Sequence, residues 1–132
     1  MTSLQVLGEE ECLRLLRSAT LGRLGFSARS LPVVLPVNYV VDGDRLVFAT
    51  EASSILAAAI NSDVACLEID DHDVLDHTGW SVLVTGQLRE LSTVEAQEAT
   101  RDQPLPLWRA MPSPQVVELS IDMVSGRRLA TV

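Results

Sequence analysis

Thr50, Ser53 and Ser54 surround a predicted passage from a β-strand into a short apolar helix, and their hydroxyl groups suit ligand chemistry. A helix start leaves backbone N–H groups without partners, and hydroxyls beside them add donors, so this turn is a place to hold a phosphate. A serine before a helix is more often an ordinary N-cap. These residues alone leave both interpretations open.

Asn38 lies in an otherwise apolar strand, between Val37 and Tyr39. A buried amide without a partner is unfavourable there, so Asn38 bonds either to neighbouring backbone or to a ligand. Pro32 and Pro36 cannot donate hydrogen bonds to a sheet. Their strand is therefore at an edge, bulged, or open toward a ligand, and the open strand is the favoured prediction.

His72 and His77 lie in an acidic stretch, residues 70–79. Their spacing is not that of a helical pair of metal ligands. Although a metal is conceivable, the pattern favours a solvated acidic loop with titrating surface histidines and no metal site.

Residues 80–87 alternate as a strand, which sends Trp80 and Val82 to one face and Ser81 and Leu83 to the other. The first face is predicted to join the core, with Trp80 as a core or interface anchor. The second, half-polar face suits a planar ligand or a second subunit. The chain has no recognisable Ser/His/Asp series, glycine-rich phosphate loop or paired carboxylates, so no catalytic residue is assigned.

The elements that must position these residues are mostly short strands. Residues 9–17 predict an amphipathic helix, Asp42-Gly43 predicts a tight hairpin, and Ser92 with Glu95 predicts a capping box that starts another helix. A proline-rich stretch, residues 104–114, is expected to wrap as a loop with apolar anchors that include Trp108. Strands are predicted at residues 23–28, 32–41, 45–50, 64–70, 79–91 and 116–121. The pattern favours one mainly β domain with short helices, residues 1–132, built as an antiparallel six-stranded barrel.

The charge balance limits the partners of this chain. Its formal net charge is −8, and all ten basic residues are arginines. Repulsion from polyanions argues against nucleic acids and anionic membrane surfaces. There is neither an apolar run of membrane-spanning length nor a signal peptide, so a soluble, cytoplasmic protein is expected.

Five motifs occur in order at residues 11–16 (ECLRLL), 21–25 (LGRLG), 35–43 (LPVNYVVDG), 79–82 (GWSV) with Gly86, and 125–128 (SGRR). Together they resemble the pyridoxamine-phosphate-oxidase-like flavoproteins, with the closest likeness to the nitroimidazole-reductase-like branch found in actinobacteria. The likeness runs from about residue 9 to residue 129 and so covers nearly the whole chain.

The resemblance implies an FMN-binding split β-barrel that pairs as a homodimer, with FMN at each of two subunit interfaces. In such proteins the hairpin strand lies along the flavin ring and ribityl chain, the strand-to-helix turn receives the phosphate, and a third strand approaches from the partner subunit. The cofactor-binding residues implied here are Pro36, Val37, Asn38, Tyr39, Thr50, Ser53, Ser54, Trp80 and Ser81.

One turn departs from the family pattern. Relatives place a glycine-serine-basic sequence at the phosphate turn, where residues 53–55 of this chain read SSI, and the chain has no lysine. Losing a charge-assisted contact predicts reduced FMN affinity, with another flavin-like ligand as an alternative. Arg23, Arg45, Arg127 or Arg128 could compensate through space.

The leading hypothesis is a flavin oxidoreductase that exchanges a hydride between FMN and a small organic substrate. Tyr39, Trp80, Trp108 and the loop from His72 to His77 are candidates for shaping the substrate pocket. A deazaflavin coenzyme is an alternative, although its acidic tail is disfavoured by the net charge. A non-catalytic binding protein, empty or haem-binding, is another. Ile55 favours it, and a histidine of the acidic loop would be the axial ligand.

Overall fold

The computed structural model describes residues 1–105 and 111–131, so the predicted anchor Trp108 lies outside the described residues. Its elements, in chain order, are β1 (Thr2–Leu7), α1 (Glu9–Ser18), β2 (Leu21–Ala28), β3 (Leu31–Asp42), β4 (Arg45–Thr50), α2 (Ser53–Ile60), β5 (Val64–Asp73), β6 (Thr78–Glu90), α3 (Thr93–Ala99), β7 (Gln115–Ser120) and β8 (Met123–Thr131). No helix in these two ranges is both long enough and apolar enough to cross a membrane.

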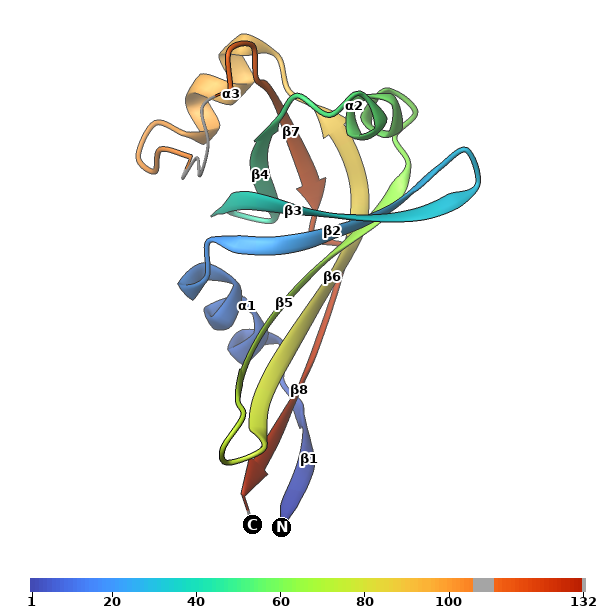
Figure 1. Cartoon of the computed structure of the whole chain (residues 1–132). Helices are drawn as coiled ribbons and strands as arrows, with labels where there is room; N and C mark the ends of the chain where they lie inside the picture. Colours follow the sequence, from blue (N-terminus) through green and yellow to red (C-terminus); the bar gives the residue numbers. More distant parts are fainter. Residues whose placement is uncertain (106–110, 132) are drawn as a thin grey trace.

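The strands form one antiparallel sheet in the order β1-β8-β6-β5-β2-β3-β4-β7, and β6 also pairs with β7 (Figure 1). The β6–β7 pairing closes six strands into a ring, in the order β2-β3-β4-β7-β6-β5. These are the six strands that the sequence predicts. The mainly β barrel with short helices is thereby confirmed. The predicted total of six strands is too low, because the sheet has two more. β8 pairs with β6, and β1 pairs with β8. The sequence pattern missed β1 because most of its side chains are exposed and do not alternate.

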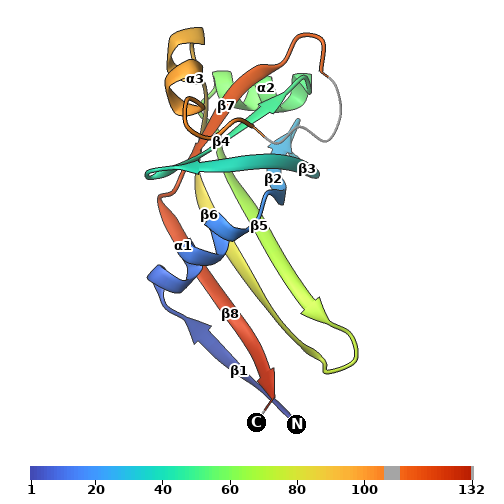
Figure 2. The same cartoon turned by 90° about the vertical axis from the view of Figure 1, so that its left-hand side faces the viewer.

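An arm built from β5, β6, β8 and β1 extends beyond the ring, and α1 packs on one of its faces (Figures 1 and 2). The side chain of Cys12 on α1 packs directly on β8, since a Cβ at Gly126 would lie 2.7 Å from its sulfur. The other face of the arm is not covered by any helix of the described chain. We call it the outer face, and it carries Leu4, Val6, Ser81, Leu83, Arg127 and Leu129.

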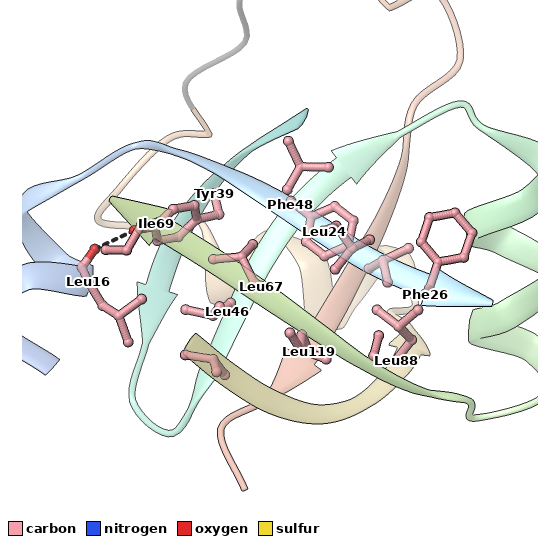
Figure 3. Packing of buried hydrophobic residues seen from close by; sticks show 14 of the residues in the cluster. Leu16, Leu24, Phe26, Tyr39, Leu46, Phe48, Leu67, Ile69, Leu88 and Leu119 are labelled. Carbon is pink, nitrogen blue, oxygen red and sulfur yellow. Dashed lines mark hydrogen bonds between the residues drawn. The ribbon is translucent and has the colours of Figure 1, made fainter. Parts of the chain in front are cut away.

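The core fills the ring, and the alternate side chains of the strands supply it (Figure 3). Every second side chain is buried in the inner parts of β5 and β6, as expected for strands with one face on the core. β4 is buried on both faces from Leu46 to Thr50. α2 adds Ile55, Ala58 and Ala59 from the end of the ring.

The half of β3 that carries the prolines has a partner strand on one side only, which fits both the edge and the open-strand alternatives. β3 pairs with β2 from Leu31 to Asn38, but it pairs with β4 only from Tyr39 to Asp42. Pro36 lies in the half of β3 that does not pair with β4, so its missing N–H costs no hydrogen bond between these two strands. The hairpin that joins the two strands is confirmed, with Gly43 at a φ of 60°.

The acidic stretch differs from the predicted loop. Its first half continues β5, where His72 pairs with Gly79, and only the residues between β5 and β6 form a turn. The carboxylate of Asp73 accepts hydrogen bonds from the N–H groups of Leu75 and Asp76, which stabilises that turn. The predicted capping box at the start of α3 is confirmed.

Candidate functional site at the split between β3 and β4

A pocket of about 340 Å³ lies where β3 and β4 separate. Before Tyr39, β3 pairs with β2, whereas Thr50 at the end of β4 pairs with Gln115 of β7, so the two strands diverge. Four of the predicted site residues line this pocket, together with Ile55. They are Pro36, Val37, Asn38 and Thr50.

The start of α2 borders the same pocket and offers hydrogen-bond donors. Thr50 is 5% exposed, and its hydroxyl oxygen accepts from the N–H of Ala52 at 3.0 Å. Ala52 is the N-cap and has no side-chain oxygen to accept from the amides that follow, and the first turn contains no acidic residue. These N–H groups also have no acceptor within the helix. Their geometry fits an anionic group such as a phosphate.

Ser53 and Ser54 are the first two residues of α2, so neither is its N-cap. The ordinary-cap interpretation is therefore wrong for both serines. Ser53 is exposed and Ser54 is half-buried, with both at the donor end of the helix.

The described lining of the pocket carries a negative charge, although its N–H donors suit an anion. Glu51 is half-buried, and one carboxylate oxygen accepts from the N–H of Ser113 at 3.1 Å. It is the only ionisable side chain among the described residues that line the pocket. Glu51 is not among the site residues predicted from the sequence, although an acid directly before a helix start is a visible signal. Ile55, at the position of the family's basic residue, is 1% exposed and packs in the core.

Tyr39 lies in the core and not in this pocket. Its hydroxyl donates to the carbonyl of Leu16 at 2.7 Å, drawn as the dashed line in Figure 3. Burial raises the pKa of the Tyr39 hydroxyl, so the group stays protonated and remains a donor. Its side chain thus ties β3 to the end of α1.

Replacing Tyr39 with phenylalanine should lower the free energy of unfolding by about 1–2 kcal/mol, because the buried Leu16 carbonyl loses its donor. Flavin affinity should stay unchanged, since the hydroxyl does not reach the pocket. Urea denaturation and flavin titration of the same variant measure both quantities. A loss of affinity at unchanged stability would contradict this assignment.

A second pocket, of about 740 Å³, lies on the arm and is lined by Trp80 and Ser81. Ser81 belongs to the outer face, whereas Trp80 points to the opposite side and packs against the core. His72 and His77 also line this pocket and are exposed. The described part of the chain contains no group of three side chains that could hold a metal. Within one chain, six of the nine predicted site residues thus fall into two separate pockets, and Tyr39, Ser53 and Ser54 line neither.

A β-ring that is split between two strands, with a helix start at the split, is a split-barrel fold. The chain belongs to the pyridoxamine 5'-phosphate oxidase family, whose model matches residues 8–128. The predicted family membership is thereby confirmed.

Individual relatives agree with this assignment. The chain is similar to the uncharacterized protein Rv0080 of Mycobacterium tuberculosis, with 35% identity over 128 residues, 93% of this chain and 84% of that protein. It also resembles the FAD binding protein from Mycobacterium smegmatis, with 31% identity, a TM-score of 0.75, and coverage of 96% of this chain and 98% of that one. An FAD-binding protein from Mesorhizobium loti has a TM-score of 0.84 at 21% identity, with coverage of 99% and 100%, and shares the fold.

Proposed function

We propose that this protein is a homodimeric FMN-binding oxidoreductase that acts on a small organic substrate. The observation that carries this proposal is the pocket at the β3–β4 split, where an unpaired strand edge meets the start of a helix capped by Ala52. This combination offers an extended surface for a planar ring and a cluster of N–H donors for a phosphate.

A second copy of the chain would complete the site. The outer face exposes apolar side chains in adjacent strands, with Leu4 of β1 at 61% and its register partner Leu129 of β8 at 38% exposure. An apolar face of this kind on a small domain is typical of an association surface. Pairing through it would bring the pocket of Ser81 on one subunit to the β3–β4 split of the other.

The residues of each subunit would then have distinct roles. Thr50 and the first N–H groups of α2 would hold the phosphate, and β3 around Asn38 would lie along the ring. Ser81 of the partner subunit would cover the ring and exclude water. A bound flavin supplies hydride transfer, and the protein supplies orientation and a shaped substrate pocket.

The named function of the M. smegmatis relative makes FAD the nearest alternative to FMN. Both carry the same ring and a phosphate on the ribityl chain. A deazaflavin coenzyme with a longer acidic tail is less favoured, because the net charge is −8 and Glu51 lines the pocket.

The proposal is tested by measuring the mass of the purified protein in solution and by titrating the flavin-free protein with FMN, FAD and riboflavin. We expect a dimer that quenches flavin fluorescence on saturation, with one flavin per chain. The protein as purified should show the visible absorption bands of a flavin.

Three results would overturn it. One is no saturation with any flavin below about 100 µM, which corresponds to very weak binding. Another is a Soret band in place of flavin bands, which would make the protein a haem carrier. The third is a monomer that binds flavin fully.

A further inference from the structure

Two carboxylates share one guanidinium on the outer face. Arg23 of β2 is in register with Glu68 of β5, and Asp70 follows Glu68 on the same face of β5. Their register partners in β6 are Leu83 and Ser81, which belong to the outer face. The Nη1 nitrogen of Arg23 donates to Oε1 of Glu68 and to Oδ2 of Asp70, each at 2.9 Å. Because both oxygens contact the same nitrogen, the two carboxylates are close neighbours, and we call them the acid pair.

The acid pair carries more charge than its arginine balances. One guanidinium offsets one carboxylate, so the fully ionised group of three has a net charge of about −1. Desolvation and the neighbouring Asp70 raise the pKa of Glu68 above its ordinary value, and Arg23 opposes them only in part. A proton on the pair is therefore already favoured in the single chain, relative to a carboxyl group that stands alone in water.

The other charged and titratable groups around the acid pair do not neutralise it. On β5, Cys66 and His72 occupy the same face, one on either side of the pair. β2 and β3 add no titratable side chain to this face beyond Arg23, and the two register partners in β6 are uncharged. β8 adds Arg127, which is in register with Ser81 and forms no ion pair or hydrogen bond with any residue in the described ranges.

The acid pair still has access to water in the single chain. It lines a hollow of about 250 Å³, whose other walls are Arg23, Gly25, Val34 and Cys66. The side chains of Glu68 and Asp70 keep 34% and 35% of their exposure. A second copy that covers the outer face would remove this water, and desolvation disfavours a charge that has no full partner. Uptake of one proton removes that charge, and the protonated carboxyl can donate to the other carboxylate.

Resting on the proposed homodimer, we propose that the acid pair makes the association of two chains depend on pH, because Glu68 and Asp70 of each chain together take up one proton when the outer face is covered. The proton comes from the solvent. The pair then keeps one negative charge, which Arg23 balances. Acidic pH thus favours the dimer, and rising pH weakens it.

The direction follows from the linkage between proton binding and association. A group that binds a proton more tightly in the dimer contributes fully below its pKa in the single chain. Its contribution is lost as the pH rises through its pKa in the dimer. Since the pKa of Glu68 is already raised in the single chain, the loss begins above the ordinary carboxyl range and extends toward neutral pH.

The first test measures the dissociation constant of the wild-type dimer by sedimentation of fluorescently labelled protein over a dilution series. Between about pH 5.5 and about pH 8 the constant should rise by about tenfold or more, with a limiting slope of about 100-fold per pH unit for two protons per dimer. A constant that stays the same or falls with rising pH would overturn the proposal. It would mean that a cation of the partner subunit balances the acid pair.

Variants of the pair itself assign the effect. Glu68→Gln keeps the shape of the side chain and leaves Arg23 with one carboxylate, so the dissociation constant should change by less than about threefold over the same pH range. At the alkaline end this dimer should be tighter than the wild type. Asp70→Asn should act in the same way, and it serves as the second variant if the first does not fold. A wild-type slope in both variants would contradict the proposal.

Two controls exclude other carboxylates and the nearby imidazole. Glu98→Gln removes an exposed acid from α3, away from the outer face, and should keep the wild-type pH dependence. His72→Gln removes the titratable neighbour on β5 and should keep it too. If His72→Gln abolishes the pH dependence, the imidazole is responsible and the role of the acid pair is wrong.

The outcomes separate this proposal from the proposed function. If the wild-type chain is a monomer at every pH, with and without flavin, the proposed homodimer fails and this proposal fails with it. If the dimer forms and its dissociation constant does not depend on pH, only the role of the acid pair is wrong. A calorimetric dilution in buffers of different ionisation enthalpy counts the protons directly. Release of less than about half a proton per dimer on dissociation, at every pH in the range, would also overturn that role.

Discussion

Replacing Gly86 with alanine should lower the free energy of unfolding by about 3 kcal/mol or more. A Cβ at this position would lie 1.7 Å from the carbonyl oxygen of Ser120, which is backbone and cannot rotate away. The clash falls where β6 changes partners, from β8 at Thr85 to β7 at Leu88. Either β6 or the end of β7 must move, and with it the pairing that closes the ring.

Urea denaturation measures the effect on Gly86→Ala, and Gly8→Ala provides the control. Gly8 is the N-cap of α1, and a Cβ there would meet no atom of a non-adjacent residue within 4 Å, so alanine should cost under about 1 kcal/mol. A Gly86→Ala protein that unfolds at the wild-type urea concentration would show that the ring does not depend on this close approach.

Leu83→Glu should convert the proposed homodimer into monomers and weaken the proposed FMN binding by about 100-fold or more. Leu83 is 40% exposed and lies on the outer face, in register with Ser125 of β8 and Glu68 of β5. A carboxylate there would lose its water on association and stand near the charge of Glu68. A monomer would keep the β3–β4 pocket but lose the residues that we assign to the partner.

Light scattering and flavin titration of the same sample test this prediction. The control is Val94→Glu on α3, which adds the same charge at an exposed apolar residue away from the outer face. It should leave both the mass and the affinity unchanged. If Leu83→Glu remains a dimer with full affinity, the two subunits meet through another surface.

The strands of the ring could be predicted because turns, prolines and helix caps are determined by residues close together in the sequence. Asp42-Gly43 specified the β3–β4 hairpin, Pro36 specified a strand without a second partner, and Ser92 with Glu95 specified the start of α3. Each of these signals acts within a few residues through a turn conformation, a missing N–H or a reciprocal cap. The ordered motifs added the family, which the comparison with known proteins confirmed.

The site could be predicted only in part, because strand alternation tells which residues share a face and not what that face meets. Alternation separated Trp80 from Ser81 and correctly assigned the Trp80 face to the core, but only the folded chain shows that the Ser81 face stays uncovered by any described helix. The sequence likewise grouped Tyr39 with Asn38 as a site residue. In the folded chain the tyrosine hydroxyl donates to the carbonyl of Leu16 instead.

By itself, the sequence determined the six strands of the ring, the half of β3 with a partner on one side only and the family, since short-range geometry and residue order carry that information. Tertiary structure alone decided that β1 and β8 extend the sheet and which arginines are engaged. Arg128 and Glu11 are 117 residues apart, and Arg45 and Glu118 are 73 apart. Ion pairs between residues so distant in the chain leave no local pattern, so which arginine stays unpaired emerges only when the strands are in register.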